Sequence, residues 1–268
     1  MVFRVFQYDI LDSMRKKKLI VGNWKMNPKT VALARAQFTA IKKGVGSFKN
    51  VEAVVAAPFV YLSELSKLKS TGLGLASQNV SAEKEGAYTG EVSASMLSGL
   101  KATYCIVGHS ERRELGESNE FINKKIKQLL AVGITPVLCI GERDRDHGMI
   151  YLGTVKTQLE ECLVGISKNM ISRIVIAYEP VWAISTTTNR RDATPEDCQE
   201  MHMYIRKVLT DAYGGANAEA VTILYGGSVD EKSASGFLSA GHVDGLLPGR
   251  ASLNPKSFLS ILKAANEL

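Results

Sequence analysis

The sequence has few of the residues that build metal sites, disulfide frameworks or membrane spans. Its 268 residues include only 4 cysteines and 4 histidines, all scattered and without a Cys-x-x-Cys pair. No apolar run approaches the ~20 residues that a transmembrane helix needs. We therefore expect no metal site, no membrane association, and buried, reduced cysteines typical of a cytoplasmic protein. The cysteines are Cys105, Cys139, Cys162 and Cys198.

Positive charge is present but is not concentrated. The formal net charge is +6, and the basic pairs and triplets are spread along the chain. A basic stripe interleaved with aromatic residues, which would indicate nucleic-acid binding, is missing, so we expect no nucleic-acid partner. A mildly basic surface suits a small anionic substrate, and solubility explains it equally well.

Residues 1–14 differ from the remainder of the chain. They include Asp9 and Asp12, and they lack the long apolar stretch and the small-residue cleavage site of a signal peptide. Two interpretations stay open: the working protein begins at or near Met14, or the segment is a short arm on the surface. We therefore divide the chain into an N-terminal extension of unknown role, 1–14, and a catalytic domain, 15–268.

From Leu19 onward, short apolar runs alternate with longer amphipathic ones. The short runs are rich in Val, Ile and Leu and mostly do not alternate with polar residues, which is typical of buried parallel strands. The predicted strands are 19–24, 52–58, 73–78, 103–108, 134–140, 173–179, 220–226 and 243–249.

Helical periodicity fills the stretches between these strands. The clearest predicted helices are 151–168 and 195–212, and the second has a start signal in Thr194, Pro195 and Asp197. Eight β-then-α units in a chain near 250 residues favour a single (βα)8 barrel, the TIM barrel, with eight parallel strands surrounded by helices. A doubly wound sheet is the alternative, but the first turn lacks its Gly-rich fingerprint.

Polar residues gather where the predicted strands end. In a (βα)8 barrel the active site lies at the C-terminal ends of the strands. Two Gly-containing turns, after strands seven and eight, suit a phosphate group because glycine lets backbone N–H groups approach an anion. The candidates are Asn23, Lys25, His109, Ser110, Glu111, Glu179, Ser228, Gly249 and Arg250.

Each candidate also has a structural explanation. Lys25 could be a solvated loop lysine, His109 a satisfied histidine at a helix start, and Glu179 one half of an ion pair with an arginine. Their shared position at one face of a barrel is what favours a joint catalytic role.

Several motifs resemble the triosephosphate isomerase family. They run in family order from about residue 19 to the end. The resemblance implies interconversion of dihydroxyacetone phosphate and glyceraldehyde 3-phosphate, no cofactor, and a homodimer formed through the 77–93 loop. The motifs are VGNWKMN (21–27), SQNVSAEKEGAYTGEVS (77–93), YCIVGHSERR (104–113), CIGE (139–142), AYEPVWAI (177–184), YGGSV (225–229) and ASLNP (251–255).

The resemblance also implies a role for each residue. Following the known chemistry of this family, Glu179 would be the catalytic base and His109 a neutral hydrogen-bond donor. Lys25 would neutralise the developing oxyanion and the phosphate, and it shares substrate binding with Asn23. Further substrate-binding residues would be Ser185, Ser228, Gly249 and Arg250, and supporting residues would be Ser110, Glu111 and Tyr225.

The sequence departs from the family pattern at two places. After AYEPVWAI the family continues with Gly-Thr-Gly, whereas this chain has Ser185 and Thr187 at the two glycine positions. The family has Gly-Gly after strand eight, whereas this chain has Gly249-Arg250. We expect the two changes to compensate, with Arg250 contacting residues 185–189.

Three rival functions remain on the residues alone. Another phosphosugar isomerase would fit the same barrel, and GHSERR together with AYEPVWAI argues against it. An inactive binding protein would have lost Lys25, His109 or Glu179, and all three are present. The third rival, a basic nucleic-acid binder, would show salt-dependent gel shifts.

Overall fold

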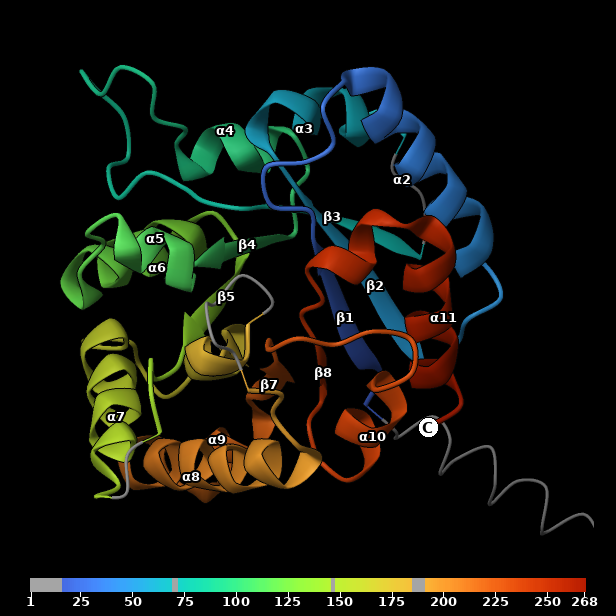
Figure 1. Ribbon diagram of the computed structural model, residues 1–268. Coiled ribbons are helices and arrows are strands. Elements are labelled where there is room, and N and C mark those ends of the chain that lie inside the picture. The colour runs from blue at the N-terminus through green and yellow to red at the C-terminus, as the bar shows by residue number, and fades with distance from the viewer. Residues whose placement is uncertain (1–15, 69–71, 146–147, 185–190) are drawn as a thin grey trace, which may run out of the picture.

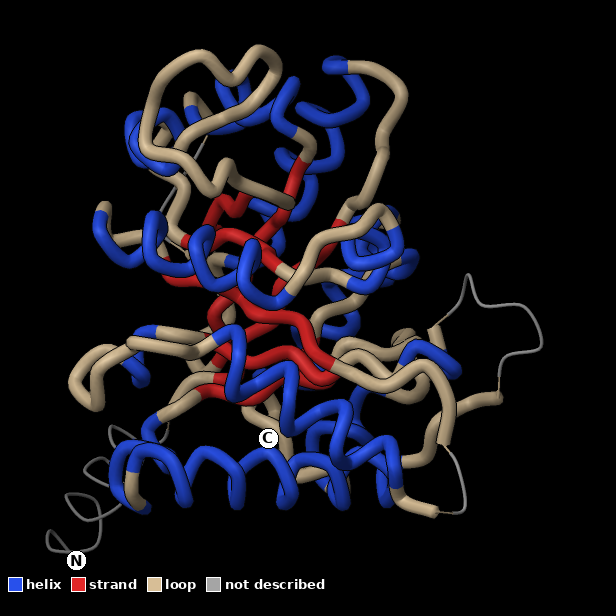
Figure 2. The backbone as a smooth tube through the Cα atoms, turned by 90° about the vertical axis from the view of Figure 1, so that its left-hand side faces the viewer, coloured by secondary structure: helices blue, strands red, loops and turns tan. Residues whose placement is uncertain are grey.

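The computed structural model describes residues 16–68, 72–145, 148–184 and 191–268. Eight parallel strands close into a barrel in chain order (Figures 1 and 2), which confirms the predicted (βα)8 fold. Closure depends on β1 pairing with β8, in the register Leu19↔Gly245 and Ile20↔Leu246. The strands are β1 (Lys18–Asn23), β2 (Val51–Ala57), β3 (Leu73–Ser77), β4 (Tyr104–Val107), β5 (Thr135–Ile140), β6 (Val175–Tyr178), β7 (Thr222–Tyr225) and β8 (Gly245–Leu246).

The strands are apolar on both faces because both faces are covered. One set of their side chains, including Val21, Ala56 and Leu224, fills the inside of the barrel. The other set, including Ile20, Val55 and Ile223, packs outward against the helices. This double burial explains why the sequence shows continuous apolar runs here instead of alternation.

Helices surround the barrel (Figure 2). Within the described residues they are α2 (Val31–Val45), α3 (Phe59–Ser66), α4 (Ala94–Gly99), α5 (Ser110–Glu114), α6 (Asn119–Ala131), α7 (Ile150–Cys162), α8 (Pro195–Tyr213), α9 (Gly215–Ala220), α10 (Ala234–Ser239) and α11 (Pro255–Asn266). Short 3-10 turns are η1 (Ile171–Arg173), η2 (Val181–Ala183) and η3 (Arg250–Leu253).

The two helices predicted in detail fare differently. The prediction for 195–212 is confirmed, and the capping box is present: Thr194 Oγ1 accepts from the Asp197 N–H, and Asp197 accepts from the Thr194 N–H. The prediction for 151–168 is too long, because α7 ends at Cys162. Gly165 follows with a φ of 75°, a left-handed conformation that cannot continue a helix.

All four cysteines are buried and unpaired with one another, as the composition predicts. Cys105 and Cys139 lie in β4 and β5, and Cys162 and Cys198 lie in α7 and α8. Burial raises the pKa of both the Cys105 and the Cys198 thiols to about 12. These thiols are therefore protonated and unreactive near neutral pH.

Candidate active site

A cavity of about 430 Å³ opens at the C-terminal ends of the strands. Seven of the residues predicted for the site line it together, although they lie as far apart in sequence as residues 23 and 250. They are Asn23, Lys25, His109, Glu179, Ser228, Gly249 and Arg250. Ser185, the other residue predicted to bind substrate, lies outside the described residues.

Glu179 directly follows β6 and is 2% exposed. Its backbone N–H donates to the Ile140 carbonyl of the neighbouring strand at 2.7 Å, which fixes where the side chain starts. One carboxylate oxygen, Oε2, accepts a 3.2 Å hydrogen bond from the Ser110 N–H. The other, Oε1, lies 3.3 Å from His109 Nε2. Within the described residues, the ionic and hydrogen-bonding neighbours of the buried carboxylate are therefore a histidine and a backbone amide, and not the arginine of the alternative explanation.

His109 is the N-cap of α5. Its Nδ1 accepts a 3.3 Å hydrogen bond from the Glu111 N–H. With Nδ1 as an acceptor, the ring N–H is on Nε2, the nitrogen that faces Glu179 and the cavity. The local turn thus presents an N–H donor to whatever occupies the cavity.

Lys25 is held in an unusual backbone conformation, with a φ of 51°. Asn23 Oδ1 accepts from the Lys25 N–H at 3.0 Å, and Gln78 Nε2 donates to the Lys25 carbonyl at 2.9 Å. The Lys25 ammonium pairs with Glu111 at 2.7 Å. A non-glycine residue at positive φ stores strain that surrounding contacts must hold, and such strain is concentrated at functional sites.

Gln78 is a positioning residue for which the sequence analysis named no role. Besides Lys25, it donates to the Ala56 carbonyl at 3.0 Å, so it joins the end of β3 to the ends of β1 and β2. Its position as the last residue of the predicted strand 73–78 was the available signal, since the same rule located the other residues of the rim.

The turn after β7 is shaped by two glycines. A Cβ atom at Gly226 would lie 2.8 Å from Glu179 Cγ, and one at Gly227 would collide with the Tyr225 hydroxyl. The Tyr225 side chain is buried beneath the turn and stacks on Phe237 with ring centroids 4.1 Å apart. Tyr225 therefore supports the turn from below and does not line the cavity.

Comparison with known proteins gives the family of the chain. The family model described as triosephosphate isomerase matches residues 18–265. The chain belongs to the triosephosphate isomerase family. Curated triosephosphate isomerases support this: that of Thermus thermophilus is 47% identical over 253 residues, 93% of this chain and 99% of the relative. That of Fusobacterium nucleatum is 44% identical over 255 residues, 94% of this chain and 100% of the relative.

The end of strand eight is a place where this triosephosphate isomerase family member departs from the family pattern. A Cβ atom at Gly249 would lie 3.5 Å from Lys25 Cε, so the glycine leaves room for the lysine side chain. Arg250 begins η3 and is exposed. The expected contact between Arg250 and residues 185–189 falls on a segment outside the described residues.

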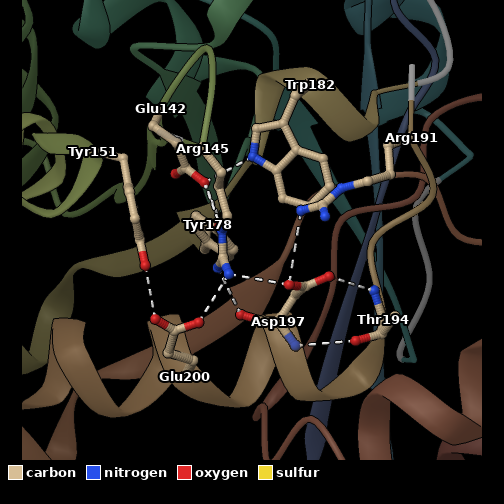
Figure 3. A network of polar contacts seen from close by, with 9 residues as sticks. All are labelled: Glu142, Arg145, Tyr151, Tyr178, Trp182, Arg191, Thr194, Asp197 and Glu200. Carbon is tan, nitrogen blue, oxygen red and sulfur yellow. Dashed lines mark hydrogen bonds and ion pairs between the residues drawn. The ribbon is translucent and has the colours of Figure 1, made fainter. Parts of the chain in front are cut away.

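A polar network lies behind the turn that follows Glu179 (Figure 3). The buried Glu142 Oε1 accepts hydrogen bonds from the Tyr178 hydroxyl and the Trp182 indole N–H, both at 2.8 Å. Burial, and then the charge of Glu142, raises the pKa of Tyr178 well above its ordinary value, so Tyr178 stays a neutral donor. Arg145 supplies the balancing charge through a 3.5 Å contact with Glu142.

Across the described parts of the chain, no group of three or more His, Cys, Asp or Glu side chains is arranged to hold a metal ion. Within the same residues, no helix combines the length and the apolar character that crossing a membrane requires.

The contact between Gly226 and Glu179 leads to a prediction. Replacing Gly226 with Ala adds a methyl group 2.8 Å from Glu179 Cγ, closer than two carbons approach, so the carboxylate must move. Moving a catalytic group by on the order of 1 Å lowers the rate of the chemical step by roughly 10²-fold. We expect kcat of the isomerase reaction to fall by about that factor in steady-state assays. Gly153→Ala is the control, because a Cβ atom there meets nothing within 4 Å; an active Gly226→Ala enzyme would contradict the prediction.

Proposed function

We propose that the chain interconverts dihydroxyacetone phosphate and D-glyceraldehyde 3-phosphate by proton transfer through an enediolate, as a step of glycolysis and gluconeogenesis. The observation that carries the proposal is the cavity in which Glu179 Oε1 lies 3.3 Å from His109 Nε2, with Lys25 in the same wall. This arrangement places a base, a neutral donor and a cation around one small space. Family membership gives the same reaction.

Glu179 would remove a proton from the carbon next to the substrate carbonyl and return it to the neighbouring carbon. Its side chain is almost completely buried, so it reaches the cavity with little water around it. The Ser110 N–H that binds Oε2 fixes the position of the carboxylate. A general base must lie within hydrogen-bond reach of the proton that it removes, and this position at the cavity wall provides that.

His109, Lys25 and Asn23 would stabilise the charge that develops on the substrate oxygens. The Nε2–H of a neutral His109 would donate to the carbonyl oxygen as it gains negative charge. The Lys25 ammonium would neutralise the oxyanion and the phosphate, with Glu111 keeping the ammonium in place until substrate arrives. Asn23 both fixes the Lys25 backbone and lines the cavity, so it can supply a further donor.

The phosphate would bind at the two Gly-containing turns. Gly226, Gly227 and Ser228 follow β7, and Gly249 and Arg250 follow β8, and all five line the cavity. Their backbone N–H groups would donate to the phosphate oxygens, and we propose Ser185 as a further donor. The proton transfers use no electron carrier, so the proposed reaction requires no cofactor.

The test is the coupled isomerase assay with glyceraldehyde 3-phosphate, run in H₂O and in D₂O. A carboxylate base that exchanges its proton with solvent puts deuterium on the carbon of the product. We expect turnover with deuterium incorporation, detected by mass spectrometry. Turnover without incorporation would indicate a direct hydride shift, and absence of turnover would contradict the proposal as a whole.

We also propose that the protein is a homodimer formed through the 77–93 loop. This loop projects from the barrel between β3 and α4 (Figure 1), and it carries an exposed aromatic residue, Tyr88. Val60 and Met96, on α3 and α4, are further exposed apolar residues. Exposed apolar side chains of this kind support an interaction surface where they form one patch. Sedimentation equilibrium should give twice the chain mass of 29.1 kDa, and Tyr88→Asp should shift the equilibrium toward one chain mass.

The place of action and the division of the chain remain proposals. Four buried, unpaired cysteines support a cytoplasmic protein, where thiols stay reduced. We propose residues 15–268 as the catalytic domain, since the family match begins at residue 18. Residues 1–14 lie outside the described residues, and their role stays open.

A further inference from the structure

Trp182 lies in the turn between the proposed base, Glu179, and a residue of the cavity wall, Ile184. It lies in the middle of η2 (Val181–Ala183), three residues after Glu179. The residue that follows η2, Ile184, lines the cavity. The turn is tied to the end of β5 by a 2.9 Å hydrogen bond from the Val181 N–H to the Glu142 carbonyl. A displacement of Trp182 would therefore move the base and one wall of the cavity together.

Arg191 contacts Trp182 in two ways. Its backbone N–H donates to the Trp182 carbonyl at 3.2 Å. Its guanidinium lies over the indole ring, 4.4 Å from the ring centroid (Figure 3). The indole N–H donates to Glu142. Trp182 is therefore held by contacts to its indole N–H, to its ring face and to its backbone carbonyl. Arg145 adds a longer cation–π contact at 5.6 Å.

The two arginines are anchored to a long helix. Asp197 Oδ1 accepts from Arg145 Nη1 at 3.0 Å and lies 3.9 Å from Arg191 Nη2. Asp197 is itself part of the capping box that starts α8. The 19-residue helix α8 thus holds Arg145 directly and Arg191 only through a longer ion pair, and both guanidinium groups lie over the indole of Trp182.

Of the two side-chain contacts of Arg191, the stacking on Trp182 is more stabilising than the ion pair with Asp197. Trp182 is 8% exposed, whereas the Arg191 side chain is 62% exposed. An ion pair at 3.9 Å with such an exposed partner contributes little. A guanidinium over an almost buried indole is the stronger interaction, because the ring face it covers is desolvated.

We propose that Arg191 is a positioning residue for the isomerisation, which acts through Trp182 to hold η2 and thereby the Glu179 carboxylate. Its described contacts are with Trp182 and Asp197, so it acts on the turn and not on the substrate. This inference rests on the proposed function for its kinetic test, and the contact itself is tested separately by fluorescence.

The kinetic test compares Arg191→Ala and Arg191→Lys with a matched control, Arg173→Ala, an exposed arginine of η1. We expect Arg191→Ala to lower kcat roughly 3- to 30-fold, the range of a partly desolvated cation–π contact. The inhibition constant of inorganic phosphate should stay within about twofold, because the phosphate turns are untouched. Arg191→Lys should recover only part of the rate, since an ammonium stacks on a ring less well than a guanidinium. An unchanged kcat in Arg191→Ala would overturn the proposal.

A double-mutant cycle with Trp182→Leu separates action through the indole from a direct effect of charge. Once the ring is gone, Arg191→Ala should have no further effect on kcat, so the two losses should be strongly non-additive. An additive loss, fully recovered by Arg191→Lys, would mean that Arg191 acts by its charge and would overturn the proposal.

Fluorescence provides the readout that does not depend on activity. The chain has 2 tryptophans, and Trp24 is fully buried, so a spectral change on removing Arg191 reports on Trp182. We expect Arg191→Ala to shift the emission maximum to longer wavelength, with an unchanged far-UV circular dichroism spectrum. An unchanged emission spectrum would overturn the proposed role of Arg191, whether or not the protein has isomerase activity. An absence of isomerase activity in the wild-type protein would instead reject the proposed function.

Discussion

Replacing Glu179 with Gln lowers kcat by roughly 10²- to 10⁴-fold, the contribution typical of a positioned general base. The amide has nearly the same shape as the carboxylate but accepts no proton at neutral pH. The phosphate turns are not altered, so the variant should bind inorganic phosphate with the same affinity as the wild type. Steady-state kinetics and phosphate binding by calorimetry measure the two effects separately.

Two further variants make this expectation sharp. Glu179→Asp keeps the carboxylate but withdraws it by one methylene, so its kcat should lie between those of the wild type and Glu179→Gln. Glu160→Gln, an exposed carboxylate of α7, is the matched control and should leave kcat unchanged. A loss in Glu179→Gln of less than about tenfold, which is ~1.4 kcal/mol of barrier, would show that another group is the base.

Replacing Lys25 with Met should lower kcat/KM by roughly 10²- to 10³-fold, the loss typical of removing one group that stabilises transition-state charge. Methionine keeps most of the side-chain length and removes the charge. Because the ammonium would contact both the oxyanion and the phosphate, we expect kcat to fall and KM to rise together. The substitution also leaves Glu111 without the ammonium group that it pairs with.

The backbone at residue 25 provides a control for this second variant. Both Lys and Met must adopt the φ of 51° found there, so the thermal midpoint of Lys25→Met should stay close to that of the wild type. Lys43→Met, an exposed lysine in α2, tests for a general effect of lost charge. Equal activity in Lys25→Met and Lys43→Met would contradict a role for the ammonium in the reaction.

Much of the fold followed from the sequence because burial leaves a clear pattern. Strands covered on both faces must be apolar throughout, and all eight predicted strands overlap observed ones. The end of α7 was missed because Ile166 continues the apolar spacing and still packs against the core. Periodicity records which side chains are buried, and it does not record that Gly165 has turned the backbone out of the helix.

The residues at the ends of the strands were predictable, because one rule places them together. The contacts between separate loops were not predictable. The ends of parallel strands lie at one rim, so Lys25, His109 and Glu179 could be expected near one another. The positive φ of Lys25 and the two donated bonds of Gln78 depend on the shear between strands, which no local pattern encodes. The stacking of Arg191 on Trp182 is of the same kind, because it joins loop ends nine residues apart whose encounter only the folded chain defines.

The hydrogen bond between the Arg191 N–H and the Trp182 carbonyl has a consequence for how the catalytic turn can move. It joins η2 directly to the residues that lead into α8, which begins at Pro195. A displacement of either segment therefore acts on the other, so the start of α8 and the turn that follows Glu179 keep one relative position.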